Sequence, residues 1–138
     1  MAEINIVIAT HGNFGIELLN SAEMIIGKTD NVYNVSLEPG MSFENFTSIA
    51  QKLLDSLSGP ILTLVDLFGG TPSNVMTFLS RKRSQKIIAG VNLPMFIDLY
   101  LKLSNNEVFD INKLTEGYLQ IYRRSIMLTN KEGNDINI

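Results

Sequence analysis

Two strongly apolar runs, at residues 4–9 and 61–65, constrain the fold of this chain more than any other feature. Apolar side chains at successive positions indicate strands that are buried on both faces, and such strands occur in parallel sheets covered by helices on both sides. Parallel neighbours must be joined by a crossover connection, which usually contains a helix. The two runs therefore predict the central strands of an open α/β sheet.

The rest of the sequence alternates between strand and helix patterns. Further short strands are predicted at residues 32–37 and 86–91, and helix starts or caps at Phe14, Ser42, Thr71, Pro94 and Asp110, the last helix ending near Arg124. Thr71 is predicted to be an N-cap because proline follows it.

Alternating strands and helices joined by short links predict an open four-stranded parallel sheet flanked by helices on both faces. Residues 125–129 follow the completed sheet and are predicted to form a fifth, antiparallel edge strand. We expect a single domain over residues 1–130 and a polar tail at residues 131–138.

The composition argues against several classes of function. A net charge of −3 over 138 residues provides no broad basic surface for nucleic acid. The absence of cysteine removes disulfides and thiolate chemistry, and a single histidine leaves too few ligands for a metal site. No apolar segment has the length of a membrane span, and the first strand begins too early for a signal peptide. We expect a soluble cytoplasmic protein with no metal, no cofactor, no nucleic acid and no direct membrane insertion.

Two groups of side chains receive structural interpretations. The basic residues 81–83 and Lys86 lie where a helix should end, where the helix dipole favours cations, although they could also receive an acidic protein surface. Six aromatic residues follow helical spacing and are expected in the core, namely Phe43, Phe46, Phe78, Phe96, Tyr118 and Tyr122.

His11 is the only histidine of the chain and lies just past the first apolar run. Open α/β sheets bind ligands at the carboxyl ends of their strands, so this imidazole is well placed for chemistry, and a histidine that only caps the strand fits equally well. Asp66 follows the second run, and adjacent parallel strands would bring it within about one strand spacing, ~5 Å, of His11. A carboxylate there accepts the Nδ1 proton and leaves Nε2 as a nucleophile, whereas Asp66 alone is more typical of a turn cap.

The segment after Asp66 contains the sequence Gly69-Gly70-Thr71-Pro72. It is compatible with a tight turn before a helix, and also with an anion site in which helix-start N–H groups face an oxyanion. We predict a phosphate-binding set of Thr10, Gly12, Gly69, Gly70 and Thr71. A histidine nucleophile, a carboxylate that orients it and an anion site together indicate phosphoryl transfer through His11. The chain has no P-loop, GxGxxG or GxSxG pattern, which argues against nucleotide enzymes and serine hydrolases.

Three motifs resemble those of one known family. IVIATHG at residues 6–12, LVDLFGGTPSN at 64–74 and AGVNLPM at 89–95 are similar to the IIA component of the mannose-fructose-sorbose family of the bacterial sugar phosphotransferase system (PTS). The resemblance implies that Nε2 of His11 accepts a phosphoryl group from phospho-HPr and passes it to a IIB component. It also implies that Asp66 holds Nδ1, that Thr71 hydrogen-bonds the phosphate, and that residues 125–129 form a strand exchanged in a homodimer.

Because donor and acceptor are both proteins, the site must stay open, and we predict docking contacts at Phe14, Leu67, Phe68 and Met95. Two other functions remain open: a phosphocarrier subunit for dihydroxyacetone kinase, and a IIA-like regulatory domain whose phosphorylation is a signal. The segments GGTPSN and GVNLPM favour the sugar branch. Neighbouring genes would separate the three, through IIB, IIC and IID partners, a kinase pair, or DNA-binding and ATPase domains.

Overall fold

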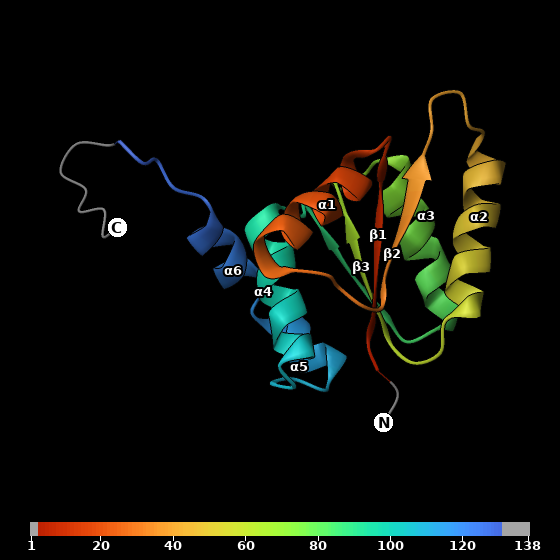
Figure 1. Cartoon of the computed structure of the whole chain (residues 1–138). Helices are drawn as coiled ribbons and strands as arrows, with labels where there is room; N and C mark the ends of the chain where they lie inside the picture. Colours follow the sequence, from red (N-terminus) through yellow and green to blue (C-terminus); the bar gives the residue numbers. More distant parts are fainter. Residues whose placement is uncertain (1–2, 131–138) are drawn as a thin grey trace.

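The sheet has the predicted central pair of strands. The computed structural model describes residues 3–130, so the predicted tail at 131–138 lies outside the described residues (Figure 1). Within that range four strands form one parallel sheet in the order β2-β1-β3-β4. They are β1 (Asn5–His11), β2 (Val32–Leu37), β3 (Ile61–Val65) and β4 (Gln85–Ala89). β1 and β3 are hydrogen-bonded neighbours, and every residue of β3 is buried, as the two apolar runs predict.

Helices cover both faces of this sheet, which confirms the predicted α/β class (Figure 1). They are α1 (Phe14–Ile26), α2 (Phe43–Ser56), α3 (Thr71–Leu79), α4 (Leu93–Ser104), α5 (Ile111–Glu116) and α6 (Tyr118–Ser125), and a 3-10 turn, Ser80–Lys82, follows α3. Alternate residues of β1 face opposite sides: Ile6 and Ile8 pack with α1, α4, α5 and α6, whereas Val7 and Ala9 pack with α2 and α3. Across the described range, no helix has both the length and the apolar character needed to cross a membrane.

Two of the predicted helix caps are formed. The Ser42 hydroxyl accepts the N–H of Asn45, and the Asp110 carboxylate accepts the N–H of Asn112. The prediction of Thr71 as an N-cap is wrong, because the chain is extended at Gly70 and α3 begins at Thr71 itself. Proline is tolerated throughout a first turn, where N–H groups have no intrahelical partner, so it does not fix the cap at the preceding residue.

Four of the six aromatic residues predicted in the core are exposed. Phe46 and Phe96 are fully buried, whereas the others are between 42% and 60% exposed, namely Phe43, Phe78, Tyr118 and Tyr122. Each of these helices buries only one face, so helical spacing alone does not say which aromatic residue lies on that face.

The C-terminal part differs from the prediction. The predicted last helix is divided at Gly117 into α5 and α6, in line with the low helix propensity of glycine. Residues 126–128 form no strand within the described chain and lead away from the domain (Figure 1). Ile126, Met127 and Leu128 are 58%, 62% and 64% exposed. The outer side of β4 pairs with no other strand among residues 3–130, so the predicted fifth strand is absent from the single chain.

Candidate functional site

The carboxyl ends of β1 and β3 bring His11 and Asp66 together. His11 is the last residue of β1, and Asp66 follows β3, whose Val65 is in register with Ala9. Nδ1 of His11 lies 2.8 Å from Oδ2 of Asp66, and the backbone N–H of His11 donates to the same oxygen at 2.9 Å. One carboxylate oxygen therefore fixes both the ring and the backbone of the histidine.

The remaining contacts of Asp66 hold it in this orientation. Its second oxygen, Oδ1, accepts the N–H of Leu67 at 3.0 Å, and its side chain is only 13% exposed. Because an ionised carboxylate can only accept hydrogen bonds, the proton of the neutral imidazole lies on Nδ1 and the lone pair on Nε2. The His11 side chain is 46% exposed, so this nucleophile is accessible from solvent.

The residue before α3 lies close to Cε1 and Nε2 of the imidazole. A Cβ atom placed on Gly70 would lie 2.8 Å from Cε1 and 3.4 Å from Nε2 of His11. In the first turn of a helix the N–H groups have no acceptor within the helix, and here Thr71 and Ser73 carry such groups whereas Pro72 has none. These donors and the positive end of the helix dipole favour an anion bound at Nε2.

Two residues of the predicted phosphate-binding set do not offer donors to this site. Thr10 is fully buried, and its hydroxyl accepts the N–H of Gly15 on the face of the sheet that α1 covers. Gly15 lies close to the sheet, because a Cβ atom on it would lie 2.6 Å from Oδ1 of Asn34 in β2. The N–H of Gly12 donates to the carbonyl of Leu37. The prediction for Thr10 is therefore wrong, because this residue is buried in the sheet. The N–H of Gly12 serves the fold, and its place in the phosphate-binding set stays a prediction.

The other three residues of the set lie in one turn. Gly69 has a φ of +90°, which few other residues adopt, and it leads the chain from Asp66 to the start of α3. Gly70 borders His11. Thr71 is the first residue of α3, and its hydroxyl makes no capping hydrogen bond.

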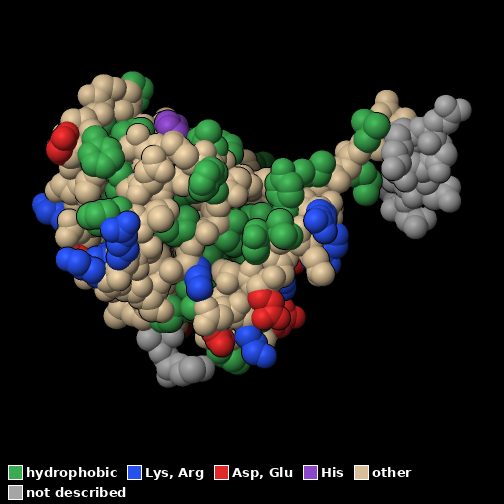
Figure 2. Space-filling view, turned by 180° about the vertical axis from the view of Figure 1, so that it is seen from behind, with side chains coloured by type: hydrophobic (Ala, Val, Ile, Leu, Met, Phe, Trp, Pro, Cys, Tyr) green, Lys and Arg blue, Asp and Glu red, His purple; other side chains and the backbone are tan. Residues whose placement is uncertain are grey.

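Three of the four predicted docking residues are exposed. Phe14, Leu67 and Phe68 are 48%, 50% and 87% exposed. Met95 is only 1% exposed and belongs to the core, so its prediction as a docking contact is wrong. In Figure 2 the histidine reaches the surface with apolar side chains nearby, and the Lys and Arg side chains visible on this face lie away from it.

Sequence reasoning missed two backbone N–H groups that hold the Asp66 carboxylate. The N–H groups of His11 and Leu67 both bind the Asp66 carboxylate, yet backbone donors leave no signal in residue identity. Among residues 3–130, no group of three or more His, Asp or Glu side chains comes together in a way that could hold a metal ion.

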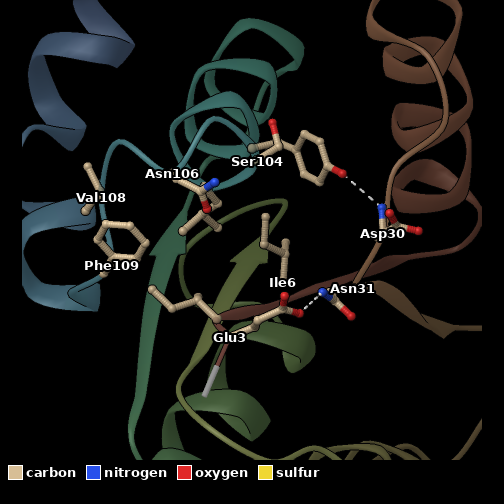
Figure 3. A pocket seen from close by; sticks show the side chains of 11 residues that line it. Glu3, Ile6, Asp30, Asn31, Ser104, Asn106, Val108 and Phe109 are labelled. Carbon is tan, nitrogen blue, oxygen red and sulfur yellow. Dashed lines mark hydrogen bonds between the residues drawn. The ribbon is translucent and has the colours of Figure 1, made fainter. Parts of the chain in front are cut away.

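A cavity lies at the amino edge of the sheet, opposite His11. It has a volume of about 580 Å³, and residues that precede β1 and β2 line it together with the end of α4 (Figure 3). Glu3 accepts a hydrogen bond from Asn31 there, and the N–H of Asp30 donates to the hydroxyl of Tyr100. The carboxylates of Glu3 and Asp30 line this cavity and no Lys or Arg among residues 3–130 does, so the described lining would repel a phosphoryl group.

The comparisons with known proteins agree with the three motifs. The family described as "PTS system fructose IIA component" matches residues 5–113. This chain belongs to that family. The match includes His11, Asp66 and the turn before α3, and it ends before residues 125–129.

Curated relatives and a solved structure support the assignment. The chain is 36% identical over 114 residues to the PTS system mannose-specific EIIAB component of Escherichia coli K12, which covers 78% of this chain and 34% of that protein. It therefore spans about a third of that relative. It is 32% identical over 99 residues to the PTS system fructose-specific EIIA component of Bacillus subtilis, covering 70% of this chain and 68% of that protein. The crystal structure of a PTS component EIIA from Streptococcus agalactiae matches with a TM-score of 0.80 and 31% identity, covering 90% of this chain and 95% of that one.

Proposed function

We propose that this IIA-family domain is a cytoplasmic phosphocarrier that accepts a phosphoryl group from phospho-HPr on Nε2 of His11 and passes it to a IIB component. The observation that carries the proposal is the 2.8 Å contact between Nδ1 of His11 and Asp66, which leaves Nε2 exposed beside the start of α3. The family is described as a fructose IIA component of the PTS, which supports an incoming sugar as the final acceptor of the phosphoryl group.

The proposed transfer is an in-line displacement at phosphorus. The Nε2 lone pair forms the new nitrogen–phosphorus bond while the bond to the donor breaks, and the electron pair of that bond stays with the donor. The ring gains positive charge, which the Asp66 carboxylate stabilises while the proton remains on Nδ1. In this proposal the N–H groups of Thr71 and Ser73, with the Thr71 hydroxyl, bind the phosphoryl oxygens. Attack by the IIB nucleophile then reverses these steps.

Both partners must reach the same nucleophile in turn, so each complex has to be transient. The exposed side chains of Phe14, Leu67 and Phe68 provide an apolar surface close to His11 for such docking. Transient interfaces of this kind are small, which agrees with a shallow site.

We further propose that the C-terminal segment pairs with a second copy of the chain. Ile126, Met127 and Leu128 are apolar and exposed, and the outer edge of β4 has no partner strand among the described residues. Exposed strand edges and exposed apolar segments both favour pairing with another chain. Asn92, which follows β4, donates a hydrogen bond of 2.8 Å to the hydroxyl of Ser125 and so anchors the start of the segment near this edge.

Truncation tests the dimer. A chain that ends at Ser125 keeps the Asn92 contact and should sediment as a monomer or aggregate in analytical ultracentrifugation. A truncated chain that remains a stable dimer would place the interface elsewhere.

The phosphocarrier proposal is tested by incubating the protein with phosphoenolpyruvate, enzyme I and HPr. Mass spectrometry should find one phosphoryl group, on the peptide that contains His11, and the adduct should be labile in acid and stable in alkali. A protein that remains unmodified, or that carries the group on another residue, would refute the proposal.

A further inference from the structure

The two residues before α3 are both glycine, and each position requires glycine for a different physical reason. Gly69 has a φ of +90°, a left-handed conformation that strains any residue with a side chain. Gly70 has φ −78° and ψ 171°, an extended conformation that every residue adopts easily. The backbone therefore explains glycine at position 69 and does not explain it at position 70.

Space explains Gly70. A Cβ atom there would lie 2.8 Å from Cε1 of His11, and Cβ contacts below 3.0 Å essentially never occur. It would also lie 3.4 Å from Nε2 and 3.5 Å from Cδ2 of Leu67. The imidazole would have to move away, although Asp66 holds it through Nδ1, the ring atom next to Cε1, at 2.8 Å.

We propose that Gly70 is a positioning residue for His11. Because Gly70 has no side chain, its Cα packs directly against the ring. The ring can then contact the Asp66 carboxylate and lie beside the start of α3. In this position Nδ1 keeps its hydrogen bond while Nε2 faces the N–H groups of α3. A side chain at position 70 displaces the ring, weakens the bond to Asp66 and moves the nucleophile away from the helix start.

This inference deepens the proposed function and rests on it for its effect on phosphoryl transfer. The position of the ring is independent of that function, and it can be measured without any partner. Because His11 is the only histidine, a protein without an affinity tag gives a single set of imidazole nitrogen signals in ¹⁵N NMR.

A capping role is the structural alternative, since Gly70 is the N-cap residue of α3. Serine is a better N-cap than glycine, and alanine is a worse one. Gly70→Ser and Gly70→Ala both add a Cβ atom beside the ring, so they separate the two roles. Gly117→Ala is the matched control, because a Cβ atom there meets nothing within 4 Å and its φ is −93°.

We expect Gly70→Ser to unfold at or above the wild-type temperature and to lose transfer as severely as Gly70→Ala. A displacement of the nucleophile by about 1 Å corresponds to a loss of about a hundredfold. The loss should fall on kcat, while KM for phospho-HPr stays near the wild-type value because the docking residues are unchanged. Gly117→Ala should transfer like wild type.

The imidazole spectrum gives the second readout. In wild type and in Gly117→Ala the signals should report a proton held on Nδ1, and in both Gly70 variants this signature should be lost or shifted. Wild-type transfer and unchanged imidazole signals in Gly70→Ser would overturn the inference and leave capping as the role of this residue. If the wild-type protein accepts no phosphoryl group, the proposed function fails, while the spectra still decide whether Gly70 positions the ring.

Discussion

The two edges of the sheet differ in structure and in charge, and only the carboxyl edge suits a phosphoryl group. At the carboxyl edge an exposed histidine meets the start of α3, and α1, α2 and α4 also begin on this side because each follows a parallel strand. At the amino edge a cavity of about 580 Å³ is lined by Glu3 and Asp30. Strand direction places the positive ends of the helices at the carboxyl edge, so this edge is a better anion site than the cavity at the amino edge.

The largest expected effect comes from removing the nucleophile at the carboxyl edge. His11→Ala should abolish labelling from phospho-HPr, because no other histidine exists in the chain. The matched change at the amino edge is Asp30→Asn, which removes an exposed carboxylate and should leave the rate of labelling unchanged. Mass spectrometry of the phosphorylated protein measures both. Labelling of His11→Ala at the normal rate, or a strong loss of labelling in Asp30→Asn, would contradict the assignment of phosphoryl transfer to the carboxyl edge.

Asp66→Asn should slow transfer by about 10–1000-fold without unfolding the protein. The amide can donate to Nδ1 and so favour the tautomer with the lone pair on the wrong nitrogen, and it stabilises no positive charge on the ring. Single-turnover transfer from phospho-HPr measures the effect, and circular dichroism checks the fold. If a folded Asp66→Asn protein transferred at the wild-type rate, the role of Asp66 would be limited to capping the turn.

The pairing of His11 with Asp66 could be predicted because two elementary constraints coincide. The apolar runs before them are compatible only with central strands, and neighbouring parallel strands end at the same edge. The roles of Gly70 and Leu67 could not be predicted in this way. One depends on the space beside a ring and the other on a backbone N–H, and neither leaves a pattern in the residue types.

Two wrong predictions, and one that the single chain does not test, have physical explanations that the sequence already contained in part. Thr10 alternates with His11 along β1, so its side chain lies with that of Ile8 on the face of the sheet that α1 covers. Met95 shares its helix face with Leu99, four residues later, and that spacing indicates core rather than docking surface. The segment 125–129 has the composition of a strand, yet a strand needs a partner, and composition does not say whether the partner belongs to the same chain.

Thr71→Ala should have a smaller effect, and it tests whether the Thr71 hydroxyl helps to bind the phosphoryl group at the carboxyl edge. The hydroxyl is no N-cap, so the free energy of unfolding should change by no more than about 0.5 kcal/mol. Loss of one hydrogen bond to a charged phosphoryl group should change the rate of transfer or of phosphohistidine hydrolysis by about tenfold. Thr71→Ser keeps the hydroxyl and should match wild type in both assays. Equal rates in wild type and Thr71→Ala would show that the backbone of α3 binds the phosphate without this side chain.

The smallest effect concerns the pH dependence of stability near the amino edge. The side chain of Glu23, near the end of α1, accepts hydrogen bonds from the hydroxyl and the N–H of Thr29, in the link that leads to Asp30. The side-chain hydrogen bond from Thr29, followed by the backbone one, lowers the pKa of Glu23 below its ordinary value. A lowered carboxyl pKa in the folded state contributes stability above the ordinary pKa of the unfolded chain, and this contribution is lost as pH falls through the folded value.

Glu23→Gln should therefore unfold at a lower denaturant concentration than wild type at neutral pH, and the two proteins should converge as the pH falls to about 3. Thr29→Val is the partial control, because it removes the hydroxyl and keeps the backbone N–H, so its pH dependence should fall between the two. Phosphoryl transfer at neutral pH should be unchanged in both variants, since neither residue touches the carboxyl edge. Parallel stability curves for wild type and Glu23→Gln across this pH range would show that the link before β2 is held by other contacts.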